Sequence, residues 1–155
     1  MKFMMNGALT IGTRDGATIE MAQEAGEDNL FLFGLTAQQV EESRGWYNPH
    51  WHYENESETR EALDLISADY FSKNEPGAFA PLLDSLLRYG DRFMNLADLR
   101  SYLEADRGLV KLYGESEAWD RKAIVNIASS GKFSSDRTIA QYAAEIWNTQ
   151  PCPVR

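Results

Sequence analysis

The chain has 155 residues, enough for one domain or for one part of a larger protein. Hydrophobic residues make up 43% of it and the formal net charge is -9, so it can bury a core but lacks the Lys and Arg excess that nucleic acid or an anionic membrane surface requires. No apolar run approaches the ~20 residues of a membrane span. The single cysteine, Cys152, cannot form an internal disulfide, which favours a reducing, cytoplasmic compartment.

The first third of the chain alternates between strand and helix patterns. Residues 8–11 are a short apolar run ending at Gly12, which predicts a buried strand. Residues 17–25 predict a helix, and residues 30–33 predict a second buried strand. A strand, a helix and a second strand in this order are typical of one unit of a doubly wound sheet. Because two strands alone are marginally stable in water, we expect the complete sheet to contain more strands.

From residue 36 onward the sequence predicts helices. Thr36 is a candidate N-cap for a helix over residues 37–42, and Ser57 is one for a helix over residues 58–70. Between them, residues 46–55 are rich in aromatic side chains and predict a turn or a short helix. Apolar residues at helical spacing predict further buried helices over residues 79–89, 99–113, 116–128 and 134–147.

Two of these helices have an apolar stripe that we expect to face a core. On the first, the inward residues are Trp119, Ala123, Ile124, Ile127 and Ala128. On the last, they are Ile139, Tyr142, Ala143, Ile146 and Trp147. The stripe that includes Trp147 therefore suggests core packing before it suggests any chemistry.

Two segments contain residue types that could bind a ligand. Residues 12–16 form a turn between a strand and a helix, but they match neither phosphate-binding glycine motif, so a tight turn is the favoured interpretation. His50, His52 and Glu54 could bind a metal ion, but a structural zinc site needs four ligands. We therefore predict no metal site here and expect a partly buried aromatic cap.

Three long segments carry a resemblance to a known family. They are KFMMNGALTIGTRDGA at residues 2–17, GEDNLFLFG at residues 26–34 and NIASSGKFSSDRTI at residues 126–139. In order and in content, these strings closely resemble the α-glucan phosphorylases, which act on glycogen, starch or maltodextrin. The resemblance covers nearly the whole chain.

The resemblance implies a cofactor and the residue that holds it. Lys2 matches the family lysine that forms a Schiff base with pyridoxal phosphate, while Asn6 and Asp15 lie in the same motif and are weaker candidates for the site. In the family, the cofactor phosphate exchanges a proton with inorganic phosphate, and the product is glucose 1-phosphate. We expect Phe3, Met4 and Met5 to help exclude water from Lys2. Without the resemblance, a single lysine would suggest a surface residue.

The resemblance also implies an architecture. The expected fold class is α/β but predominantly helical, the C-terminal part of the second Rossmann-like domain of a two-domain (GT-B type) glycosyltransferase. Residues 1–35 would be a βαβ remnant of the cofactor-binding domain, residues 36–147 a helical part ending in the crossover helix, and residues 148–155 a loose tail. The partners in the intact enzyme would be the α-glucan, inorganic phosphate and the N-terminal phosphorylase portion.

Two kinds of function remain open at this point. As a phosphorylase fragment, the chain would contain no residue that is catalytic in isolation and would be inactive alone. As an alternative, it would be a non-enzymatic helical interaction module or the complementing subunit of a split phosphorylase. Exposed apolar surface would then mark the partner site and could also lead to self-association.

Overall fold

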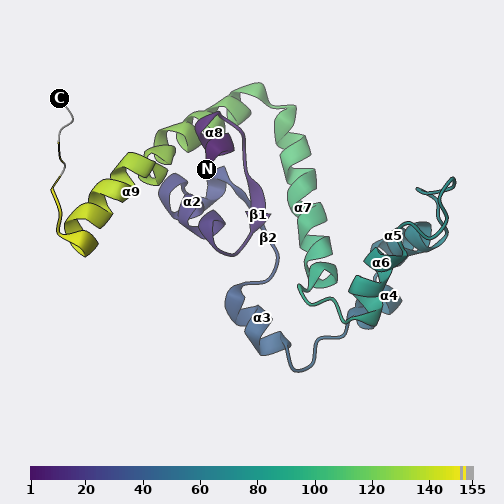
Figure 1. The fold of residues 1–155 in the computed structure, drawn as a ribbon. Coiled ribbons are helices and arrows are strands. Elements are labelled where there is room, and N and C mark those ends of the chain that lie inside the picture. The colour runs from purple at the N-terminus through teal and green to yellow at the C-terminus, as the bar shows by residue number, and fades with distance from the viewer. Residues whose placement is uncertain (151, 153–155) are drawn as a thin grey trace. The chain divides into compact units, whose positions relative to one another are not determined.

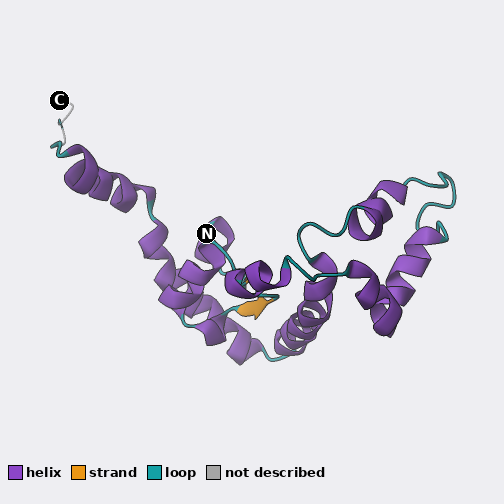
Figure 2. Ribbon diagram, turned by 90° about the horizontal axis from the view of Figure 1, so that it is seen from below, coloured by secondary structure: helices purple, strands orange, loops and turns teal. Residues whose placement is uncertain are grey.

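The computed structural model describes residues 1–150 and residue 152, and it divides into two compact units (Figure 1). Unit 1 comprises residues 1–12, residues 16–31 and the described residues from 109 onward, and unit 2 comprises residues 13–15 and 32–108. Figure 2 confirms a helical majority with one small sheet. Of the predicted loose tail, residues 151 and 153–155 lie outside the described residues.

The small sheet consists of β1 (Ile11–Thr13) and β2 (Phe31–Phe33), which are joined by α2 (Ala17–Ala25) and the 3-10 turn η1 (Glu27–Asn29). The strands are parallel, because the pairing advances in the same direction along both of them. The N–H of Phe31 donates to the carbonyl of Thr10, and the N–H of Arg14 donates to the carbonyl of Phe33. The predicted strand–helix–strand order is therefore confirmed, and a larger Rossmann-like sheet stays a prediction.

The first strand begins later than the predicted run over residues 8–11. The preceding segment is the one-turn helix α1 (Lys2–Met5), which the sequence pattern did not predict. Ala8 N–H donates back to the carbonyl of Phe3, and Gly7 has φ +81°, so the chain is still completing the helix end there. Pairing with the other strand can therefore start only at Thr10.

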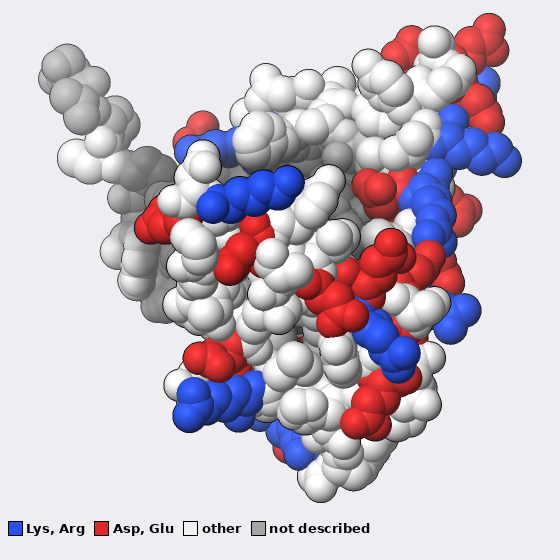
Figure 3. All heavy atoms as spheres, turned by 90° about the vertical axis from the view of Figure 1, so that its right-hand side faces the viewer, with Lys and Arg blue, Asp and Glu red and all other residues white. Residues whose placement is uncertain are grey.

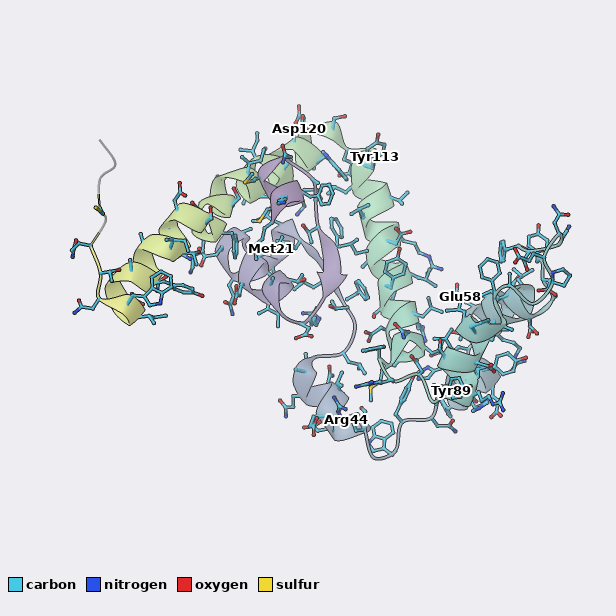
Figure 4. The ribbon with its side chains drawn as sticks, viewed as in Figure 1. Met21, Arg44, Glu58, Tyr89, Tyr113 and Asp120 are labelled. Atoms are coloured by element: carbon cyan, nitrogen blue, oxygen red, sulfur yellow. The ribbon has the colours of Figure 1, made fainter. Side chains whose placement is uncertain are left out.

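Unit 1 is built around α8 (Ser116–Ser129), which packs against α1 and α2 and continues into the 3-10 turn η3 (Ser130–Phe133). Its buried residues include Met4, Met21, Ala22, Ala25, Leu30 and Asn126. Met21 of α2 is labelled in Figure 4, as are Tyr113 and Asp120 on the two sides of the turn that leads into α8.

The predicted inward face of α8 is confirmed only in part, because Trp119 and Ala123 are half-buried and the other predicted residues are exposed. Ile124 is 65% exposed and Ile127 is 44% exposed, whereas Asn126 is fully buried. The side-chain amide of Asn126 donates to the backbone carbonyls of Asn29 and Lys122. A polar side chain that closes the end of α2 and η1 thus decides which side of α8 faces inward, and the two isoleucines lie off that side.

The last helical segment consists of α9 (Ser135–Tyr142) and the π-helical turn η4 (Ala143–Trp147). The predicted core stripe is exposed instead, at 54% for Ile139, 43% for Tyr142, 66% for Ile146 and 54% for Trp147. The main contacts of α9 are with its own neighbours η3 and η4, which leave this stripe exposed.

Unit 2 begins with three short helices, which are α3 (Ala37–Ser43), α4 (Pro49–Asn55) and α5 (Ser57–Ser67). Thr36 is confirmed as an N-cap, because its hydroxyl accepts from Gln39 N–H and the Gln39 side chain accepts from Thr36 N–H. Ser57 is not the predicted cap. The backbone is extended at Glu56, which is the N-cap, so Ser57 already belongs to the helix.

The predicted helix over residues 79–89 divides into α6 (Ala80–Leu83) and the π-helical turn η2 (Asp84–Arg88). It is not buried, since Phe79 is 39% exposed and Leu82 is 45% exposed. The wider π turn, in which Tyr89 N–H donates to the carbonyl of Asp84, breaks the helical spacing. The leucines of α6 and those within η2 therefore do not share one buried face.

The long helix α7 (Asn95–Tyr113) ends before Gly114 as predicted but begins at Asn95 rather than at residue 99. Its early start depends on Asp91, whose carboxylate accepts a hydrogen bond from Leu96 N–H in the first turn. Leu96 is the buried residue of this helix, and the predicted stripe is confirmed only in part. Leu99, Leu103 and Leu109 are half-buried, whereas Tyr102, Val110 and Tyr113 are exposed.

The charged side chains do not gather into a continuous basic patch on the face shown in Figure 3, where acidic and basic residues are interspersed. Among the described residues, every helix is too short or too polar to cross a membrane.

Candidate functional site

The motif at the start of the chain places Lys2 at the first position of α1, with its side chain exposed. Asn6 follows the helix, and its side-chain amide donates to the backbone carbonyl of Lys2 over 2.7 Å. Asn6 therefore fixes the backbone beside Lys2. Asp15 belongs to the turn between β1 and α2 and is assigned to unit 2, whereas Lys2 and Asn6 are in unit 1.

The apolar neighbours of Lys2 do not shield it as expected. Phe3 is 82% exposed and Met5 is 57% exposed, while Met4 is fully buried. Consecutive side chains on a helix point about 100° apart, so a single turn can direct only one of the three into the core. The expectation that all three exclude water from Lys2 is therefore wrong for this structure.

The residues of α1 fit one requirement of pyridoxal phosphate. The cofactor attaches through an imine, which needs a primary amine that the aldehyde can reach. Lys2 offers such an amine, and the structure shows no hydrogen bond or ion pair that joins its Nζ to another described residue. Lys2 therefore meets this chemical requirement, and its role as the attachment point stays a prediction.

The turn over residues 12–16 is a strand-to-helix turn, as its sequence predicts. Gly16 is the N-cap of α2 with φ +52°, a left-handed value that favours glycine. At Gly12, an added Cβ would lie 2.9 Å from Cγ2 of Thr18, so a side chain would collide with the start of α2. Both glycines are thus explained by the tight turn itself.

Residues 46–55, which include His50 and His52, form α4 and the turn that precedes it. His52 Nδ1 lies 3.1 Å from Oε1 of Glu56, an ion-pair distance without hydrogen-bond geometry. The His52 ring lies 5.2 Å from Trp51 and 5.7 Å from Tyr47. Within residues 1–150 and 152, no group of His, Cys, Asp and Glu side chains is arranged to hold a metal ion.

A buried carboxylate that the sequence analysis did not select joins three parts of unit 2. Asp91 is 1% exposed and accepts hydrogen bonds from the hydroxyl of Tyr47, the amide of Asn95 and the N–H of Leu96, at 2.7 to 2.8 Å. Burial and the hydrogen bond to Asp91 raise the pKa of Tyr47. The arrangement connects the start of α4 to the start of α7.

A second carboxylate, that of Asp98 on α7, holds the backbone segment after β2. Asp98 Oδ1 accepts from Leu35 N–H at 2.8 Å, and Ser101 accepts from Gly34 N–H at 2.9 Å. Burial raises the pKa of Asp98, the hydrogen bond from Leu35 opposes that shift, and the charge of Asp91 adds to it.

The raised pKa of Asp98 predicts how stability depends on pH. The folded chain holds the proton of the Asp98 carboxyl more tightly than the unfolded chain does. The protonated carboxyl therefore contributes to the free energy of unfolding below the ordinary pKa of 3.8, and this contribution is lost as pH rises through the folded pKa. Asp98→Asn keeps an acceptor for Leu35 and cannot ionise. We expect its unfolding free energy, relative to the original chain, to be higher at pH 7 than at pH 3.5. Urea unfolding at both pH values checks this, and an equal difference at the two would contradict it.

The strand–helix–strand segment and the helices that follow define a predominantly helical α/β chain, with the motif lysine at the start of α1. A family model described as Carbohydrate phosphorylase matches residues 1–149, which is almost the entire chain. The chain therefore belongs to the carbohydrate phosphorylase family. This confirms the family that the three motif strings indicated.

Curated relatives agree with this assignment. The chain is 50% identical over 153 residues to the brain form of glycogen phosphorylase from Mus musculus and 49% identical over 152 residues to the brain form from Homo sapiens. It is 48% identical over 153 residues to the muscle form from Rattus norvegicus. Each match covers 97% of this chain but 18% of the relative, so the chain spans less than a fifth of these proteins.

Proposed function

We propose that this chain is part of an α-glucan phosphorylase, an enzyme that cleaves a glucan with inorganic phosphate and releases glucose 1-phosphate. The observation that carries the proposal is the family match over residues 1–149, together with 48–50% identity to glycogen phosphorylases. The glucan, the inorganic phosphate and the remaining phosphorylase portion are its proposed partners, and a reducing cytoplasm is its proposed compartment.

Within that enzyme, we propose that Lys2 attaches pyridoxal phosphate. When bound, the cofactor supplies a phosphate group that exchanges a proton with the substrate phosphate. The chain's own contributions are the Lys2 amine and the backbone position that Asn6 fixes through its hydrogen bond to the Lys2 carbonyl. Asp15 is a weaker candidate for the same site, and its turn would support the motif.

The isolated chain is expected to be inactive and to show no selective attachment of the cofactor. The Lys2 side chain is exposed, as is that of Lys111, so the isolated chain gives the cofactor no reason to prefer Lys2. After incubation with pyridoxal phosphate and borohydride trapping, mass spectrometry should find Lys2 labelled no more than the exposed Lys111 of α7. With glycogen and phosphate added, no glucose 1-phosphate should appear.

Either of two results would show that these residues need no further portion of the enzyme. One is trapping that is concentrated at Lys2 and absent from a Lys2→Ala variant. The other is measurable glucose 1-phosphate from the purified chain. The Lys111→Ala variant is the matched control, because it removes another exposed lysine of the same chain.

The exposed stripe on α9 and η4 favours a role as a subunit or interaction module within the same enzyme. Ile146 and Trp147 are more than half exposed, and large apolar surfaces of this kind usually contact another protein surface. We propose that the stripe packs on the remaining phosphorylase portion. Light scattering should then show self-association of the isolated chain, reduced in an Ile139→Glu, Ile146→Glu variant. A clean monomer of the unmodified chain would contradict this proposal.

A further inference from the structure

Unit 2 contains a cavity of about 600 Å³ between the end of α3, the start of α4 and the first turn of α7. Arg44, labelled in Figure 4, marks the end of α3 just before the aromatic residues that line this cavity. The aromatic lining consists of Trp46, Tyr47, Trp51 and His52, and Leu35 and Ala97 add apolar surface. We call this the aromatic pocket.

The indole rings of the aromatic pocket are accessible. Trp46 is 75% exposed and Trp51 is 54% exposed, so neither ring is buried in the core and both can contact a ligand. Trp51 meets the His52 ring edge to face, with 88° between the ring planes and 5.2 Å between centroids. Aromatic faces carry a negative electrostatic potential, and indole carries the strongest, so these rings favour a positively charged ligand.

Three carboxylates lie directly behind the lining of the aromatic pocket. Asp91 accepts from the Tyr47 hydroxyl at 2.7 Å, and Asp98 accepts from the Leu35 N–H at 2.8 Å. Glu56 lies 3.1 Å from His52 Nδ1. None of the described lining residues is a Lys or Arg, and Asp91 is almost fully removed from water. Carboxylates behind the lining, and a described lining without Lys or Arg, favour a cation over an anion in this pocket.

From this combination we propose that the aromatic pocket binds a small alkylated ammonium ion, such as one that bears a trimethylammonium group. A bare metal ion would need oxygen ligands, whereas this lining is mostly apolar. A neutral apolar ligand would gain nothing from the three carboxylates. A trimethylammonium group carries both a diffuse positive charge and an apolar surface of methyl groups, and it matches the rings and the charge together.

The test uses two ligands of nearly the same shape. Choline carries the trimethylammonium group, and 3,3-dimethyl-1-butanol is its neutral carbon counterpart. The chain has four tryptophans, of which Trp46 and Trp51 line the pocket and Trp119 and Trp147 belong to unit 1. Indole N–H signals in 15N NMR spectra report on the four sites separately. We expect choline to shift the Trp46 and Trp51 signals and to bind about tenfold more tightly than the neutral alcohol.

Equal binding of the two ligands would overturn the proposal, because the pocket would then recognise shape and apolar surface alone. Absence of any choline-dependent shift at Trp46 and Trp51 would overturn it as well. These outcomes are independent of the proposed phosphorylase function, because they measure ligand binding to unit 2 and involve neither Lys2 nor glucan.

A variant pair adds a second readout. Trp51→Leu keeps an apolar side chain at an exposed position but removes the aromatic face, so choline affinity should fall by about tenfold while affinity for the alcohol changes little. Trp119→Leu, in unit 1, should leave both affinities unchanged. If unit 2 of Trp51→Leu does not fold, as judged from the Trp46 signal, the two ligands on the unmodified chain still decide the question.

Discussion

Replacing Asp91 with alanine is expected to destabilise unit 2 by about 3 kcal/mol or more, because several hydrogen bonds to one buried carboxylate disappear together. The Leu96 N–H is buried at the start of α7 and would lose its acceptor, while Tyr47 and Asn95 would lose theirs at the same position. Asp91 is 1% exposed, so water cannot readily replace the missing oxygen atoms. The start of α4 and the start of α7 should loosen together.

Urea unfolding, followed through the indole signals of Trp46 and Trp51, measures this effect within unit 2. Asp91→Asn is the conservative variant, since it keeps one acceptor and tolerates the left-handed φ of +44°. Its loss should be smaller than that of Asp91→Ala. Glu61→Ala is the matched control, because it removes an exposed carboxylate from α5 and should change stability by less than about 0.5 kcal/mol. Similar losses for Asp91→Ala and Glu61→Ala would contradict the account of Asp91.

The second large effect is expected for Asn126→Asp, which should destabilise unit 1 by about 4 kcal/mol at neutral pH. The side-chain amide of Asn126 donates to the carbonyls of Asn29 and Lys122, and the residue is fully buried. An aspartate of the same shape would place a carboxylate against two carbonyl oxygens without any donor. The substitution therefore adds charge burial and repulsion to the loss of both hydrogen bonds.

The indole signals of Trp119 and Trp147 follow this change in unit 1 during urea unfolding. Gln23→Glu on α2 makes the same conversion of an amide to an acid at an exposed position, and it should cost less than about 0.5 kcal/mol. If Asn126→Asp proved no more destabilising than Gln23→Glu, Asn126 could not be the residue that holds α8 against the end of η1.

Local signals in the sequence predicted the elements whose ends depend on nearby residues. The helix over residues 17–25 and the N-cap at Thr36 are examples, because each is complete within a few residues. The orientation of the helices depended on contacts far away in the chain. Asn126 reaches Asn29 from α8, so the periodicity of α8 alone placed Ile124 and Ile127 on the wrong side.

The candidate site likewise has features that nearby residues predict and features that depend on distant contacts. The motif string that contains Lys2 identified the family without any structure, and the comparison over residues 1–149 agrees with it. The sequence singled out the aromatic residues 46–55 but gave no comparable signal for Asp91, because Tyr47 and Asp91 are 44 residues apart in sequence. Asp91 is followed by Arg92 and Phe93, and no periodic pattern around it predicts that it is buried. Only the fold brings it to Tyr47.

The most direct test of the proposed function is a chimera in which this chain replaces the matching segment of the Mus musculus brain phosphorylase, where the identity is 50% over 153 residues. The chimera should bind pyridoxal phosphate at Lys2 and release glucose 1-phosphate from glycogen and phosphate. Its Lys2→Ala form should fold equally well and lose that activity, while its Lys111→Ala form should keep it. A folded chimera without activity, or one whose activity survives Lys2→Ala, would contradict the proposal.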